Sequence, residues 1–361
     1  MHRPGNPTAA VLLALVLACA CSPTPGPSPR RATLQGLTDE VFLPMVDAVE
    51  ARAADLSARS QQLCDTPSEA SLQSARDAWH DARERMKQAE VLGFGPHSLP
   101  PWRLAGQLDF WPARPESIEA ALSEKVAMGA DAGLSLGAAE KGLPAIEYLL
   151  FGPRSTPDDF ASEPQRCDYL LALCEDLERQ AGRLNDAWRD SFVDELLIAP
   201  GTERYATIGK SFEEVVNSLV ATVEIVRLDK IGRPFGLKAG GEVQPQELES
   251  RFAPRSLRDA IDTLRGVDAV FHGRYERHRT GGLSDMLRQA GRPKDAQFTR
   301  NMEAAVEALE SIPAPLERAL TREKPAVEAA LEELRQLQVF LQVDLTQALA
   351  VTVTFGGSDG D

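Results

Sequence analysis

The sequence has few aromatic residues, few cysteines and no long hydrophobic run, and each shortage excludes a class of protein. Aromatic residues make up 6% of the 361 residues. Five cysteines in a chain of this length are too few for a disulfide-rich scaffold. The main apolar run, residues 9–18, is too short to cross a bilayer as a helix. A polytopic membrane protein is therefore excluded.

Positive charge is also scarce. The chain has 39 Lys and Arg against 54 Asp and Glu, for a formal net charge of −15. A surface this acidic repels phosphate backbones, so nucleic acid is not expected as a partner. The sequence contains neither a glycine-rich phosphate loop with lysine nor an H-E-x-x-H zinc motif. What remains, with 43% hydrophobic and 26% charged residues, is an ordinary globular composition.

The N-terminus is typical of a bacterial lipoprotein signal. Arg3 precedes the apolar run 9–18, which has the length of a secretory signal core. Cys19 and Cys21 each follow small residues, as in a lipobox, and either could carry the lipid. An ordinary cleaved signal with incidental cysteines is the alternative. We therefore assign residues 1–21 to the signal peptide.

The segment after the signal is rich in proline. Alternating prolines over residues 22–29 block helix and sheet and favour an extended tether, which we assign to residues 22–32. Neither candidate cysteine is followed by Asp, which by resemblance to lipoprotein sorting indicates the outer membrane, facing the periplasm. The sequence thus predicts a globular body held by a lipid anchor.

Three further cysteines are expected to form one disulfide, because the periplasm is oxidising. Cys167 and Cys174 lie seven residues apart on one predicted helix, too far along its axis to bond each other. We expect a Cys64–Cys167 bond, with Cys64–Cys174 as the alternative. The remaining cysteine is expected to be a buried apolar residue.

The rest of the chain shows helical periodicity. Apolar residues recur at spacings of three and four, which is typical of amphipathic helices. The stripes include Phe42–Leu63, Leu72–Met86, Leu170–Trp188, Ile208–Val226, Leu257–Phe271 and Val327–Leu345. The sequence predicts an all-α fold of two antiparallel bundles of the four-helix type packed together, with a boundary near Pro200 that separates residues 33–200 from 201–361.

One short helix is predicted to carry an inward-facing acid. Pro144 suits an early helical position, and a glycine and a proline follow Phe151. Glu147 shares its face with Leu143 and Leu150. A carboxylate among apolar neighbours is costly unless it is paired, protonated or bound to a metal. It could therefore be a ligand, or the structural partner of a hydrogen-bond donor or an arginine.

This segment resembles the imelysin-like family, whose motif is G-x-H-x-x-E followed by an aromatic and apolar stretch. Gly142 and Glu147 match the motif, whereas Pro144 occupies the histidine position. The resemblance extends over nearly all of residues 33–361. Its other parts are Ala78-Trp79, Phe110-Trp111-Pro112, Arg166–Leu170, Glu249–Phe252 and the C-terminal segment 349–361.

The resemblance implies a two-bundle helical protein of the bacterial envelope. Members of the family are linked to peptidase activity and to iron-regulated uptake, and the motif His and Glu are regarded as metal ligands or catalytic residues. Proline has no imidazole and cannot bind a metal. A metallopeptidase needs several protein ligands and an open position for water, so Pro144 argues against peptidase activity.

Other side chains could replace the missing histidine. His97 lies in a loop, Glu90 follows the Trp79–Met86 stripe, and Asp109 adjoins the Trp-Pro turn. If they converge on Glu147, an oxygen-rich site with one histidine would suit Fe(III), Ca(II) or Mn(II) better than zinc. The alternative is that His97 is an ordinary loop residue and Glu90 a surface charge.

Three functional classes follow. The preferred one is a non-catalytic, iron-related binding or uptake-accessory lipoprotein that holds iron, another metal or a metal-bearing ligand between the bundles. The alternatives are a metallopeptidase of the imelysin type with a substituted ligand, and an interaction scaffold for an envelope protein partner.

Overall fold

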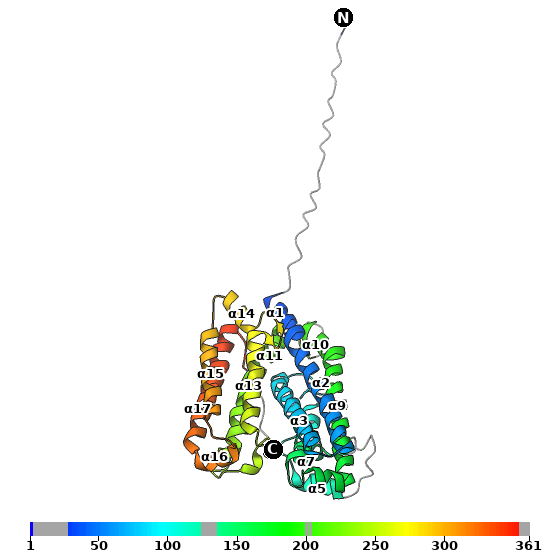
Figure 1. The fold of residues 1–361 in the computed structure, drawn as a ribbon. Helices are drawn as coiled ribbons and strands as arrows, with labels where there is room; N and C mark the ends of the chain where they lie inside the picture. Colours follow the sequence, from blue (N-terminus) through cyan, green and yellow to red (C-terminus); the bar gives the residue numbers. More distant parts are fainter. Residues whose placement is uncertain (3–27, 124–135, 199–201, 203, 354–361) are drawn as a thin grey trace.

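The computed structural model describes residues 1–2, 28–123, 136–198, 202 and 204–353, and nearly all of these lie in helices or in the turns between them (Figure 1). The all-α expectation is therefore confirmed. The lipidation candidates Cys19 and Cys21 lie outside the described residues. In the described part of the chain, no helix combines the length and the apolar character needed to cross a membrane.

The N-terminal half, residues 29–198, is built around three long helices. The first is α1 (Pro29–Leu37), which continues through η1 (Thr38–Phe42) into α2 (Leu43–Asp65). The others are α3 (Glu69–Ala89), which continues into η2 (Glu90–Leu92), and α9 (Pro164–Ala187), which continues through η4 (Trp188–Phe192) into α10 (Val193–Leu197). The shorter helices between them are α4 (Ala105–Leu108), α5 (Pro115–Ser123), η3 (Ala138–Glu140), α7 (Gly142–Phe151) and α8 (Pro157–Ser162).

The C-terminal half, residues 204–353, also consists of long helices with short connections. Its long helices are α11 (Ile208–Ile225) with η5 (Val226–Gly232), α13 (Ser256–His272), α15 (Asp295–Glu310), and α17 (Lys324–Val339) with η7 (Phe340–Leu345). Its short elements are α12 (Arg233–Phe235), η6 (Pro245–Glu247), α14 (Leu283–Gln289), α16 (Leu316–Arg322), α18 (Thr346–Leu349) and a hairpin of β1 (Arg274–Tyr275) and β2 (His278–Arg279).

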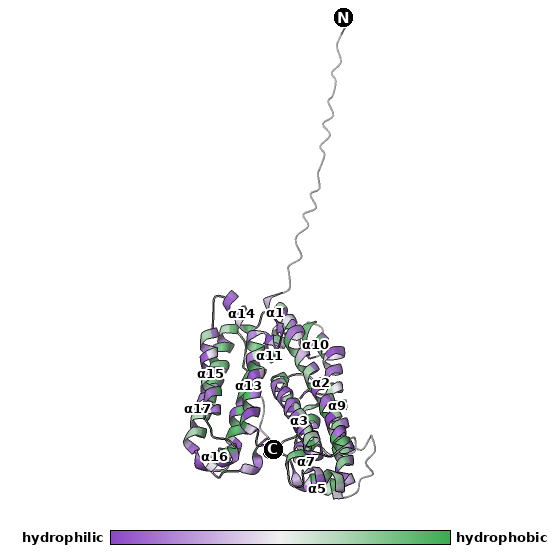
Figure 2. Ribbon diagram, viewed as in Figure 1, coloured by the Kyte–Doolittle hydropathy of each residue, from purple (hydrophilic) through white to green (hydrophobic). Residues whose placement is uncertain are grey.

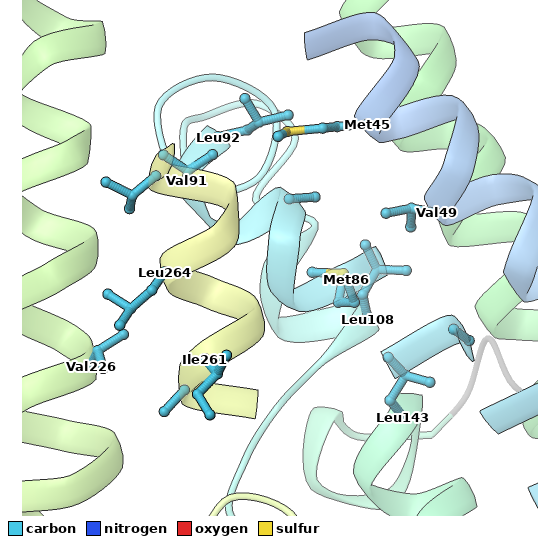
Figure 3. Packing of buried hydrophobic residues seen from close by; sticks show 14 of the residues in the cluster. Met45, Val49, Met86, Val91, Leu92, Leu108, Leu143, Val226, Ile261 and Leu264 are labelled. Atoms are coloured by element: carbon cyan, nitrogen blue, oxygen red, sulfur yellow. The ribbon is translucent and has the colours of Figure 1, made fainter. Parts of the chain in front are cut away.

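The helices are amphipathic and pack side by side. Figure 2 shows hydrophilic and hydrophobic residues alternating along α9, α15 and α17. Within the halves, α2 packs against α3 and α9, and α15 packs against α17. Buried apolar side chains from both halves form one continuous cluster, part of which Figure 3 shows. The two halves therefore share a core, and the division at residue 200 remains a prediction about chain organisation.

A disulfide joins two helices of the N-terminal half. Cys64 at the end of α2 bonds Cys167 in α9, with the Cα atoms 5.6 Å apart. This is the pairing that the sequence favours over Cys64–Cys174. Cys174 is a free, buried cysteine whose thiol contacts Ser60. The bond closes a loop with a sequence separation of 103 residues, which restricts the unfolded chain.

The two halves meet closely where α3 packs against α13. A Cβ atom at Gly266 of α13 would lie 2.1 Å from the carbonyl oxygen of Gln88 in α3. No side chain fits between backbones at this distance. Gly266 therefore sets the separation of the two helices, and with it the position of the polar residues that they carry.

Replacing Gly266 tests this contact. We expect Gly266→Ala to lower the free energy of unfolding by about 1–3 kcal/mol, because the added methyl group must push α3 and α13 apart. The measurement is urea unfolding followed by circular dichroism. The control is Gly106→Ala in α4, where an added Cβ has no neighbour within 4 Å. Equal stability of the two variants would contradict the close contact.

Candidate functional site

A cavity of about 310 Å³ lies between the two halves. On one side it is lined by the end of α3, by η2 and by the segment 93–111; on the other it is lined by α11, η5 and α12. The wall combines apolar side chains such as Met86 and Ile225 with polar ones, among them Glu90, Asp109 and His97. Three of the four residues predicted as metal ligands therefore line one cavity.

His97 is the unusual residue of this wall. Its side chain is only 2% exposed, yet neither ring nitrogen has a hydrogen-bond partner among the residues that the structure describes. Burial lowers the pKa of His97 to about 4, so the ring is neutral at pH 7. A neutral imidazole offers one lone pair and one N–H. The ring is therefore free to bind a metal or to exchange hydrogen bonds with a ligand in the cavity.

Glu90 and Asp109 lie beside a third acid, Glu249, and the three offer ligand oxygens within 4.8 Å of one another. These three carboxylates are already paired with the ammonium groups of two lysines. The Lys87 ammonium group contacts Glu90 and Asp109 at 2.5 Å and also bonds Glu249. Lys230 contacts Glu249 at 2.7 Å and Glu90 at 3.0 Å.

A buried arginine completes the cluster. Arg83 bonds Asp109, lies 3.0 Å from Glu249 and 3.1 Å from Asp259. We call Arg83, Lys87, Lys230, Glu90, Asp109 and Glu249 the buried ion network. Three positive and three negative side chains are thus matched within it.

Lys87 and Glu249 stay ionised in spite of their burial. Burial and the neighbouring Arg83 lower the pKa of Lys87, but Asp109, Glu249 and Glu90 outweigh them and raise it above the usual range. Burial raises the pKa of Glu249, but Lys230, Lys87 and Arg83 hold it well below the usual range. Each charge is therefore stabilised by its partners and would be costly without them.

The loop before α13 supplies part of this network and is itself held by further polar contacts. Ser250 and Arg255 both bond Asp259, and Arg255 also contacts Asp262 at 2.8 Å. Thr263 donates a hydrogen bond of 2.8 Å to Glu90. The loop and α13 of the C-terminal half are in this way linked to α3 and η2.

Glu147 occupies a different position from the one predicted for a metal ligand. One carboxylate oxygen accepts hydrogen bonds from the backbone N–H groups of Phe252, at 2.7 Å, and Ala253, at 2.8 Å. Among the described residues, Glu147 does not belong to the acids that lie close enough to share a metal ion. These contacts match the alternative that Glu147 is the structural partner of hydrogen-bond donors. They fix the loop that carries Glu249.

Gly142 also has a structural task. Its φ is +76°, and a Cβ atom there would lie 2.6 Å from the carbonyl oxygen of Leu108, the residue before Asp109. Only glycine combines this backbone conformation with so close an approach. The indole of Trp79 donates a hydrogen bond of 3.0 Å to the carbonyl of Leu143, which ties α7 to α3. Gly142 thus lets α7 pack against the segment that presents Asp109.

The residues at the motif do not fit a peptidase metal. Pro144 is buried in α7 and has no ligand atom in its side chain. Glu147 bonds backbone N–H groups, and the nearest acidic cluster is neutralised by Lys87 and Lys230. A hydrolytic metal would need several free ligands and an open position for water. We therefore derive no catalytic step at this site.

The sequence pointed to Glu90, Asp109 and His97 but not to the cations around them. Arg83 and Lys87 follow Trp79 at intervals of four residues, so they lie on the buried face of α3. This spacing was the available signal for them. Glu249 lies in a loop and Lys230 in η5, where periodicity gives no comparable indication.

The burial of Glu147 predicts a pH-dependent stability. Burial, opposed by the N–H groups of Ala253 and Phe252, raises the pKa of Glu147 to about 8, against 4.5 for an exposed side chain. The folded protein therefore keeps a proton that the unfolded chain has lost. This contribution to the free energy of unfolding is complete below about pH 4.5 and is lost as the pH rises through about 8.

Glu147→Gln keeps an acceptor oxygen but stays neutral. As the pH rises from about 5 to about 8, we expect the free energy of unfolding of this variant to increase relative to that of the natural protein. Urea unfolding across this range measures the difference, with Glu303→Gln at an exposed position of α15 as the control. A difference that stays constant with pH would show that Glu147 is ionised throughout.

Comparisons with known proteins agree with this fold. The family model for imelysin matches residues 43–342. Iron-regulated protein A from Synechococcus elongatus is 31% identical over 294 residues, which are 79% of this chain and 76% of that protein.

Two solved structures share the fold at 17% sequence identity. One is from Parabacteroides distasonis, assigned as an iron-regulated protein A precursor, with a TM-score of 0.76 over 91% of this chain and 97% of that one. The other is an imelysin-like protein from Psychrobacter arcticum, with a TM-score of 0.73 over 90% and 97%. On the match of its family model and on its curated relative, this chain belongs to the imelysin family.

Proposed function

We propose that this protein is a non-catalytic, iron-related binding protein that holds a small metal-bearing ligand in the cavity beside His97. The observation that carries the proposal is the buried His97 ring on the wall of a cavity of about 310 Å³. In the described part of the chain, neither of its two nitrogens has a hydrogen-bond partner. A buried polar group without a partner is costly unless a ligand or water satisfies it. Membership of the imelysin family and the name of the curated relative support the relation to iron.

The charges around the cavity favour a ligand that brings its own coordination shell. Lys87 and Lys230 neutralise the carboxylates of Glu90 and Glu249, so a bare cation would compete with two ammonium groups. A cavity of this volume falls at the lower end of the range for small-molecule sites. A metal chelate with one open position could take a nitrogen of His97 as its next ligand.

A location in the bacterial envelope is part of the proposal. The support is the sequence of residues 1–32, with its signal-like run, the two candidate cysteines Cys19 and Cys21, and the proline-rich tether. The Cys64–Cys167 disulfide suits an oxidising compartment such as the periplasm. An anchored protein would hold its ligand near the outer membrane and could pass it to an envelope partner.

Binding measurements test the role of His97. We expect ferric citrate to bind the purified protein and His97→Ala to weaken binding at least about tenfold, because the imidazole is lost as a ligand. Isothermal titration calorimetry and metal analysis measure this, with Fe(II), Mn(II) and Zn(II) salts as parallel probes. The control is His278→Ala in the β-hairpin, where the histidine contacts Glu40 outside the cavity.

The outcomes separate the remaining functional classes. Equal binding by His97→Ala and the natural protein would show that the ligand does not contact His97. Absence of any bound metal, together with thermal unfolding that no probe changes, would favour the interaction scaffold. Cleavage of casein that both a chelator and Glu147→Ala abolish would restore the metallopeptidase.

A further inference from the structure

Lys87 makes an unusual set of contacts in the buried ion network. Its side chain is fully buried, and its ammonium group reaches three separate carboxylates, those of Glu90, Asp109 and Glu249. An ammonium group has three N–H donors and no acceptor. Each donor therefore has its own carboxylate, and the nitrogen lies at the centre of the three acids.

The three carboxylates have the spacing of a cation site. Their ligand oxygens all lie within 4.8 Å of one another. Two oxygens that share a Ca²⁺ or Mn²⁺ ion at about 2.4 Å can be at most twice that distance apart, so the spacing fits a common ion. Glu90 and Asp109 also line the cavity, which offers an ion a route to the group and room for water ligands. On the same wall lies the buried imidazole of His97, which has no hydrogen-bond partner within the described ranges.

The charge count shows why the natural protein does not need an added ion at this point. Three carboxylates face three cations, Arg83, Lys87 and Lys230. Asp259, which Arg83 also contacts, is itself paired with Arg255, so the charges around Lys87 balance. A divalent ion placed between the acids would add two positive charges to this balance and would have to displace the ammonium group. Without Lys87, the same acids would carry one uncompensated negative charge in a buried place, which is costly.

We infer that the Lys87 ammonium group occupies the position of a divalent cation and thereby determines what this cluster binds. In the natural protein the group excludes exchangeable metal from the three carboxylates. In a chain without it, the same carboxylates form a site for a hard divalent cation. The inference is independent of which ligand His97 receives, since it concerns only the position between the acids.

The test replaces Lys87 by a neutral side chain of similar length. We expect Lys87→Met to bind one Mn²⁺ ion at least about tenfold more tightly than the natural protein, because each of the three carboxylates loses the ammonium donor that lies between them. Titration calorimetry and the electron paramagnetic resonance of Mn²⁺ report binding. Since the ion binds only the folded state, the melting temperature of the variant should rise with Mn²⁺ concentration.

Two control variants separate position from charge. Lys230→Met removes one positive charge from the same network but leaves the Lys87 nitrogen between the acids, so it should gain no Mn²⁺ site. Adding Glu249→Gln to Lys87→Met should abolish the gain, whereas adding His97→Ala should leave most of it. Equal gains in Lys87→Met and Lys230→Met would overturn the inference, because charge alone would then account for binding.

The inference can also be tested if Lys87→Met does not fold in buffer. Refolding of Lys87→Met from urea is carried out with and without Mn²⁺. Recovery of the cooperative fold only with the ion would support the inference, since the ion then replaces the ammonium group. Failure to fold under both conditions would overturn it, as would a folded variant that binds no Mn²⁺. Mn²⁺ binding by the natural protein that Glu249→Gln abolishes would overturn it equally.

Discussion

The contact on which the structure depends is the one between Lys87 in the N-terminal half and Glu249 in the C-terminal half, both fully buried. Neither charge would be stable there alone, because removing one partner leaves an uncompensated charge in a medium of low dielectric constant. Two further pairs cross the boundary between the halves, Arg83 with Glu249 and Lys230 with Glu90. A hydrophobic contact would tolerate a shift between α3 and α13, but paired charges with directed hydrogen bonds do not. The network therefore fixes the register of the two halves as well as their association.

The same arrangement explains the two residues that match the family motif, Gly142 and Glu147. Gly142 allows α7 to touch the backbone just before Asp109, and Glu147 binds the backbone just after Glu249. Each supports a segment that delivers one acid to the buried ion network. Both tasks are independent of an imidazole at position 144. A chain with Pro144 can thus retain the architecture around the motif while lacking one side chain that metal chemistry would require.

The fold followed from the sequence because helices with one apolar face have a periodic signature, as in the stripe from Leu170 to Trp188 that becomes α9. The candidate site followed only in part. The sequence singles out Glu90 near the Trp79–Met86 stripe and Asp109 beside the Trp-Pro turn. The contacts that join the two halves connect residues more than a hundred positions apart, and no periodicity encodes them. Lys230 reaches Glu90 across 140 positions of sequence. The burial of His97, which lies in a loop between Pro96 and Ser98, likewise depends on tertiary packing.

The buried ion network also has a consequence for how the chain matures. Proteins are synthesised from the N-terminus, and domains that have their own core can fold while the remainder emerges. Here Arg83 and Lys87 must wait for Glu249, which is translated about 160 residues later. Until then Arg83 and Lys87 have Glu90 and Asp109 as their partners in the network. Cys64 and Cys167 both lie in the first half and can already form their disulfide. The buried ion network is therefore complete only after residue 249 has been made, whereas the disulfide needs no residue of the second half.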